Sequence, residues 1–288
     1  MVQLIDSDIK TREVLDWKGV HVFHFFLSSC SQKLRIVLNL KGIEWQPHSI
    51  DLSKNENLTP WFLGINPRGL LPVLVHDGAV HIESNDIIAY LERTFPKVKL
   101  IPEGHEDEVA ALLKHEDELH MDLRGLSFRF VFAPPGPPKS AEDLERYAAA
   151  SSTTVQGRDD HAKLDEQIDF WKAYAAQGYT DAAVRQSAQT FRRAFDDLDE
   201  RLAGHPYLLG DKLTVLDVAW FIYVNRLMLA GYPVGRLHPR LGAWFADLKA
   251  RPEFAKEIAL PPPVGEAFAA TRKAHEEAGQ SLEAVAGF

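Results

Sequence analysis

The junction between a predicted strand and a predicted helix reads Leu27-Ser28-Ser29-Cys30-Ser31-Gln32-Lys33-Leu34-Arg35-Ile36-Val37-Leu38. Upstream, residues 20–26 are almost all apolar or aromatic, as in a strand buried on both faces of a sheet. Downstream, apolar residues follow helical spacing as far as Gly42, a residue typical of a helix C-terminal cap. The serines between the two segments are acceptable N-caps, so the sequence predicts a helix whose free N–H groups point beyond its first turn.

The start of this helix can stabilise an anion, and a thiolate is the chemically useful one. A free thiol ionises near pH ~8.5, and lowering that value by about two units requires roughly 2.7 kcal/mol. A hydrogen bond to a charged group supplies about 1.5 to 3 kcal/mol, and the helix end supplies about 0.3 to 1 kcal/mol. One serine hydroxyl is therefore sufficient to activate a thiol, which can be that of Cys30 or one carried by a ligand.

Composition restricts the class of protein. The 288 residues suffice for one large domain or two, and 45% hydrophobic with 25% charged residues is typical of a globular chain. The net charge of −9 argues against nucleic acid or an anionic membrane as a partner. A single cysteine favours a reducing compartment. Residues 1–18 lack the features of an export signal and no apolar run approaches ~18 residues, so we expect a short N-terminal extension and a cytoplasmic protein.

Further along the first half, residues 46–52 read as a second strand. Residues 71–82 form the clearest hairpin signal in the chain, with two apolar runs joined through Asp77-Gly78. Ser84 is suited to cap a helix that Pro96 ends. The predicted order is β-α-β-β-β-α, which resembles a thioredoxin-like α/β domain.

These motifs together resemble a cytosolic glutathione transferase. The resemblance rests on Ser-Ser-Cys-Ser with Lys-Leu-Arg, on Asn66-Pro67-Arg68-Gly69, on Leu71-Pro72-Val73 and on Glu83-Ser84. It covers residues 20–96 strongly and the helical remainder more loosely, and the first motif is most similar to the zeta class. It implies a glutathione-binding domain followed by an all-helical domain that supplies the pocket for an electrophile, a homodimer, and glutathione as cosubstrate.

The resemblance also implies site residues. Ser28 falls on the thiol-activating serine, with Ser29 and Cys30 in the same wall of the site, and these three are the catalytic candidates. Leu71 would pair its backbone with the cysteinyl unit of glutathione, and Pro72 would be cis. The remaining glutathione-binding candidates are Glu83 and Ser84 for the γ-glutamyl end and Asn57 for the glycyl end.

Simpler roles compete with some of these. Plain helix capping is the alternative for Ser28 and Ser29, and plain packing is the alternative for Cys30. Ser28 also stands where redox-active relatives carry a cysteine, which argues against a mixed-disulfide mechanism.

The second half reads as helical. We predict a linker at residues 97–105, a helical domain at 106–260 with an inserted segment at about 133–182, and a C-terminal tail at 261–288. Helices are expected at 106–132, 188–202, 215–230 and 241–249, the third opened by a capping box of Thr214 and Asp217. His115 and His120 are five residues apart and do not share a helix face, so no metal site is expected.

Three glutathione-dependent chemistries remain open. Conjugation to an apolar or aromatic electrophile in detoxification is the default. Cleavage of β-aryl ethers is suggested by the inserted segment, which is similar to one in bacterial β-etherase-type transferases. Cis-trans isomerisation of a maleyl-type acid is suggested by Ser-Ser-Cys. A non-enzymatic interaction module with the same fold is the alternative from another class.

Overall fold

The computed structural model describes residues 2–132, 138–151 and 153–288, so the first residues of the inserted segment predicted at about 133–182 lie outside the described residues. The chain divides into two compact units. The first comprises Met1–Val98 and Gly136–Gln177, and the second comprises Lys99–Pro135 and Gly178–Phe288. Most of the inserted segment predicted at about 133–182 within the helical domain therefore belongs to the first unit, with the thioredoxin-like sheet.

The first unit is built on a five-stranded sheet with strand order β1-β5-β4-β2-β3. The strands are β1 (Val2–Gln3), β2 (Val20–His24), β3 (Gln46–Ser49), β4 (Val73–His76) and β5 (Ala79–Ile82). β2 and β3 are parallel and the other pairs are antiparallel. This confirms the predicted β-α-β-β-β-α order, with β1 as an addition. The residues set apart as an N-terminal extension thus complete the sheet, and Leu4, Ile9 and Val14 are buried in its core.

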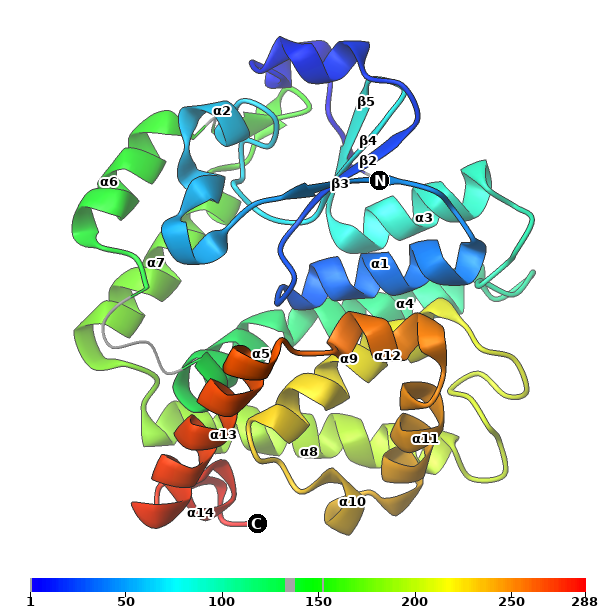
Figure 1. Cartoon of the computed structure of the whole chain (residues 1–288), viewed down its shortest axis with the longest axis vertical. Coiled ribbons are helices and arrows are strands. Elements are labelled where there is room, and N and C mark those ends of the chain that lie inside the picture. The colour runs from blue at the N-terminus through cyan, green and yellow to red at the C-terminus, as the bar shows by residue number, and fades with distance from the viewer. Residues whose placement is uncertain (1, 133–137, 152) are drawn as a thin grey trace. The chain divides into compact units, whose positions relative to one another are not determined.

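Two long helices, α1 (Ser29–Lys41) and α3 (Ser84–Thr94), lie side by side in this unit (Figure 1). Lys33 Nζ donates to Asn85 Oδ1 at 2.8 Å near their starts, and Lys41 Nζ donates to Glu92 Oε1 at 2.6 Å near their ends. The two helices therefore run in the same direction, and their N-termini lie together. The shorter elements are α2 (Pro60–Leu63) and 3-10 turns at Asp6–Asp8, Arg12–Asp16, Leu52–Lys54 and Glu56–Leu58.

His81 is a buried histidine in the middle of the sheet. The residue is only 1% exposed, and its ring stacks on Tyr90 with 3.9 Å between ring centroids. Neither ring nitrogen has a hydrogen-bond partner within the described residues. Burial, with smaller effects of the charges of His76 and Arg93, lowers the pKa of His81 to about 4.

We expect the free energy of unfolding to fall as the pH is lowered from 6.5 toward 4. Near the middle of this window the unfolded chain binds a proton at His81 that the folded chain does not, so the slope there approaches about 1.4 kcal/mol per pH unit. Urea unfolding of the wild type and of His81→Phe at several pH values would measure this effect. An identical pH dependence in the two proteins would contradict the assignment to His81.

Residues 138–177, called the arm below, carry α6 (Ala141–Ala150), the strands β6 (Thr154–Val155) and β7 (Arg158–Asp159), and α7 (His161–Gln177). The arm buries apolar side chains at two places against the rest of the first unit, residues 2–98. Val155 joins the core cluster that contains Phe23 and Val80. Tyr147, Leu164 and Ile168 form a second cluster with Leu63 of α2. This burial explains why the arm packs with the sheet domain.

The second unit is helical in its described residues. Its elements are α4 (Glu106–Glu118), α5 (His120–Ser127), a π-helical turn (Phe128–Phe132), α8 (Asp181–Arg201), α9 (Val215–Leu229), α10 (Val234–Leu237), α11 (Pro239–Lys249), α12 (Pro252–Ile258), α13 (Pro262–Glu277) and α14 (Leu282–Ala286). The helix predicted at 106–132 is interrupted at Leu119, where ψ is 0°. α8 begins earlier than predicted because the Thr180 side chain accepts from Ala183 N and caps it.

Helix α9 forms the centre of this unit, and the predicted capping box is present at its start. Thr214 is the N-cap, and Asp217 Oδ2 accepts from both the backbone N–H and the hydroxyl of Thr214. Asp217 Oδ1 also accepts from Leu208 N at 2.9 Å and from Trp244 Nε1 at 3.0 Å. Asp217 is fully buried. One carboxylate thus joins the start of α9, the preceding loop and α11.

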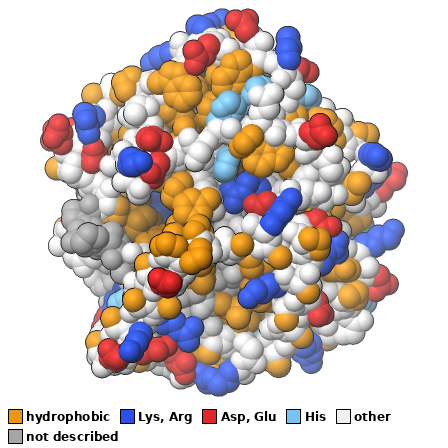
Figure 2. All heavy atoms as spheres, viewed as in Figure 1, with side chains coloured by type: hydrophobic (Ala, Val, Ile, Leu, Met, Phe, Trp, Pro, Cys, Tyr) orange, Lys and Arg blue, Asp and Glu red, His pale blue; other side chains and the backbone are white. Residues whose placement is uncertain are grey.

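On the face shown in Figure 2, basic and acidic side chains are intermixed, apart from the residues drawn in grey. Within the described residues, no helix is both long enough and apolar enough to span a bilayer.

Candidate functional site

Three segments predicted from separate motifs meet at one end of the five-stranded sheet. Phe23 near the end of β2 pairs with Val73 at the start of β4, and β4 pairs antiparallel with β5. The loop after β2, the peptide bond before β4 and the residue after β5 therefore lie at the same end. α1 and α3 begin there, so the positive ends of two helix dipoles face this end and favour negatively charged groups.

Ser28 is the N-cap of α1. Its backbone is extended, with φ −68° and ψ 121°, and its Oγ accepts from Ser31 N at 3.3 Å. A serine hydroxyl offers one donor and two acceptor positions. Because the capping bond uses an acceptor position, the hydroxyl proton of Ser28 remains available to donate to an anion.

The loop before Ser28 is fixed by side chains of α1. Ser31 Oγ accepts from Phe25 N at 3.4 Å, and Arg35 donates to the carbonyl oxygens of Phe25 and Phe26 at 3.3 and 3.2 Å. Ser31 and Arg35 are both buried. The position of the Ser28 hydroxyl is thus determined by the helix that it caps. Ser29 and Cys30 occupy the next two positions and are half-buried.

Each of the other two segments has an unusual backbone feature. The Leu71–Pro72 peptide bond is cis, as expected. Glu83 adopts φ 65° and ψ 115°, a conformation that a non-glycine residue rarely adopts. Such backbone costs about 1 to 3 kcal/mol and occurs most often at ligand sites. The prediction that Ser84 caps α3 is wrong, because the N-cap is Glu83 and its side chain makes no capping bond. Ser84 is the first residue of the helix and is buried.

Asn57 contacts the segment that precedes Leu71. It is buried, and its Nδ2 donates to the carbonyl oxygen of Gly69 at 2.7 Å. Asn66 Nδ2 likewise donates to Leu70 O at 2.8 Å. These two amides hold the chain that leads into Leu71, and a contact between Asn57 and a ligand stays a prediction.

Sequence reasoning missed the charged residues beside Glu83. Arg68 donates from Nη1 to Glu83 Oε1 at 2.6 Å, and from Nε and Nη2 to the two carboxylate oxygens of Asp160, both at 2.7 Å. Tyr147 Oη donates to the carbonyl oxygen of Arg68 at 2.6 Å. The available signal was that Arg68 is the only charged residue between Ile65 and Val75. Nothing in the polar stretch around Asp160 indicated its partner.

This combination of a thioredoxin-like domain, a cis-proline, a helix-capping hydroxyl and a strained acidic residue is suited to binding a thiol-containing peptide. Comparison with known families agrees. The model of the glutathione S-transferase N-terminal domain matches residues 27–94, and the model of the C-terminal domain matches residues 181–247. Residues 95–180, including the arm, lie between the two matches.

Some relatives match this chain only over about 80 residues, and others match over most of its length. Glutathione S-transferase 1 of Dianthus caryophyllus is 46% identical over 84 residues, which are 29% of this chain and 38% of that protein. The zeta-class glutathione S-transferase of Euphorbia esula is 42% identical over 81 residues, 28% of this chain and 36% of that protein. The chain thus spans little more than a third of either.

LigF of Sphingobium sp. strain SYK-6 matches over most of its length. It is 26% identical over 241 residues, 80% of this chain and 90% of that protein. The crystal structure of LigF, described as a beta-etherase, superposes with a TM-score of 0.69 and covers 83% of this chain and 98% of that one. The chain belongs to the cytosolic glutathione S-transferase superfamily.

Proposed function

We propose that the protein binds glutathione and activates its thiol as a thiolate for attack on an electrophilic carbon of an apolar or aromatic substrate. The observation that carries this proposal is the convergence of Ser28, the cis Leu71–Pro72 bond and Glu83-Ser84 at one end of the sheet. Ser28 donates a hydrogen bond to the sulfur and is not the nucleophile. Ser29 and Cys30 border the sulfur in the first turn of α1.

The remaining parts of glutathione have partners of suitable chemistry. The backbone of Leu71, before Pro72, pairs with the cysteinyl unit. The α-carboxylate of the γ-glutamyl unit binds at the start of α3 beside Ser84, where the positive end of the helix dipole favours an anion. Glu83 accepts from the α-ammonium group of the same unit. Asn57 binds the glycyl end.

Cleavage of a β-aryl ether is the second candidate reaction. The glutathione thiolate would form a C–S bond at the ether carbon, the C–O bond would break, and the aryloxide would leave. This alternative is supported by the similarity to LigF, which extends over both family domains. Both reactions place the same demands on Ser28.

Glutathione titration by calorimetry, followed by product analysis, tests the proposal. An activated aryl halide, a β-aryl ether and a maleyl-type acid would be assayed in parallel with glutathione present. We expect binding and turnover of at least one of the first two substrates. Turnover of the maleyl-type acid alone would place cis-trans isomerisation ahead of conjugation and ether cleavage. A lack of glutathione binding at millimolar concentration would support a non-enzymatic interaction module instead.

We further propose a homodimer whose contact face lies near Lys114 to Arg124. Exposed charged residues of α4, including Asp117 and Glu118, are available there. Sedimentation velocity at micromolar concentration would reveal the dimer, and a monomeric profile would refute it.

A further inference from the structure

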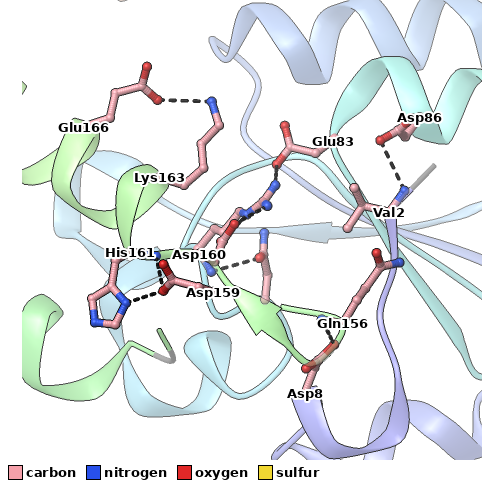
Figure 3. Close-up of polar contacts among 12 residues, drawn as sticks. Val2, Asp8, Glu83, Asp86, Gln156, Asp159, Asp160, His161, Lys163 and Glu166 are labelled. Atoms are coloured by element: carbon pink, nitrogen blue, oxygen red, sulfur yellow. Dashed lines mark hydrogen bonds and ion pairs between the residues drawn. The ribbon is translucent and has the colours of Figure 1, made fainter. Parts of the chain in front are cut away.

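We propose that Asp160 of the arm is a positioning residue of the glutathione site, which acts through Arg68 to hold the Glu83 carboxylate for the α-ammonium group of glutathione. The inference rests on the proposed function. The contacts that carry it lie within the first compact unit, in which Asp160 and Glu83 belong to segments far apart in sequence (Figure 3).

The arm is anchored to the first unit independently of Asp160. Gln156 N donates to Asp8 Oδ2 at 2.9 Å, and Gln156 Nε2 donates to the carbonyl oxygen of Gln3 at 2.7 Å. Tyr147 Oη contacts the backbone of Arg68, and Val155 is buried in the core. Asp160 is therefore presented to Arg68 from a fixed segment.

Asp160 and Arg68 form a bidentate pair, the geometry in which a guanidinium binds a carboxylate most specifically. The side chains of Arg68 and Asp160 are 13% and 14% exposed, and that of Glu83 is 33% exposed. Burial lowers the pKa of Arg68, but the hydrogen bonds and charges of Asp160 and Glu83 outweigh it and raise the pKa. Arg68 is thus a permanent cation whose Nε, Nη1 and Nη2 all donate to the two carboxylates.

Asp160 also sets the charge of the group. Asp160, Arg68 and Glu83 together carry one net negative charge, which attracts an ammonium group. Without the charge of Asp160, Arg68 would neutralise Glu83, and the attraction would be lost. Because Glu83 keeps its second carboxylate oxygen free of Arg68, that oxygen can accept from a ligand while Arg68 holds the other.

The first test compares two thiol ligands on Asp160→Asn. Asparagine keeps the size of the side chain and one acceptor for Arg68, and it removes the charge. We expect glutathione to bind about tenfold more weakly, with kcat at saturation nearly unchanged. Glutaryl-cysteinyl-glycine lacks the α-ammonium group and should bind the variant and the wild type equally well. The matched control is Asp159→Asn, since the exposed side chain of Asp159 pairs with His161 (Figure 3).

A double-mutant cycle with Glu83→Gln separates positioning from a structural role. If Asp160 acts through Glu83, Asp160→Asn should have no further effect on glutathione affinity in the Glu83→Gln background. Equal weakening of both ligands, additive effects in the cycle, or unchanged glutathione affinity would overturn the proposal. Tighter binding would also overturn it, because it would mean that Arg68 itself binds the ligand. Failure of the wild type to bind either thiol would overturn the proposed function and this inference together.

Discussion

Ser28→Ala is expected to raise the pKa of the thiol of bound glutathione by about one to two units and to lower kcat/KM by about 10- to 150-fold at neutral pH. The physical reason is the loss of a hydrogen bond to a charged sulfur, which contributes about 1.5 to 3 kcal/mol. Thiolate absorbance in the ultraviolet, followed against pH in the glutathione complex, measures the pKa directly.

Controls for this variant must separate activation from helix capping, because Ser28 Oγ also accepts from Ser31 N. Loss of the cap costs about 0.5 to 2 kcal/mol of stability. Ser28→Thr keeps both the hydroxyl and the cap, and it should retain the lowered pKa. Cys30→Ala removes the single thiol of the chain and should leave the thiolate absorbance of bound glutathione intact. If Cys30→Ala abolishes the signal and Ser28→Ala does not, the activated thiol is that of Cys30.

Asp217→Asn should lower the free energy of unfolding of the helical unit by about 2 to 6 kcal/mol. The amide nitrogen that replaces one carboxylate oxygen cannot accept a hydrogen bond, so two buried donors lose their acceptor, at about 1 to 3 kcal/mol each. Whichever way the amide lies, it faces the Thr214 pair or the pair formed by Leu208 N and Trp244 Nε1. Chemical denaturation followed by tryptophan fluorescence and circular dichroism would measure the loss.

Asp211→Asn is the matched control for Asp217, because Asp211 precedes the same helix and its side chain is 87% exposed. It should change stability by less than about 0.5 kcal/mol. Equal effects of the two substitutions would mean that the buried carboxylate does not hold α9, the loop before it and α11 together.

The parts of the fold that sequence reasoning predicted are those with local signals. Ser28 and Gly42 bound α1 as its N-cap and its left-handed C-cap, and Asp77-Gly78 closes the β4–β5 hairpin. Thr214 and Asp217 form the expected capping box. In each case the residues that decide the structure lie within a few positions of one another.

The parts that were missed depend on contacts distant in sequence. Asp160 is 92 residues from Arg68, and no periodicity in its polar surroundings pointed to a partner. In the hairpin of β6 and β7, Val155 is the one strand residue that is buried, and it packs in the core of the sheet domain. The interruption at Leu119 occurs without proline or glycine at that position, so composition gave no indication of it. Tertiary packing determines the positions of Asp160 and Val155.

The two outer strands of the sheet also limit pairing between the sheet edges and strands of other chains. β3 carries Pro47, which cannot donate to a further strand, and β1 is only two residues long. Deleting residues 2–18 would remove β1 and leave the strand Ala79–Ile82 with unpaired backbone groups along one side. Such an edge is a template for intermolecular β-pairing, so a chain that lacks residues 2–18 should aggregate, whereas one that retains them should stay monodisperse.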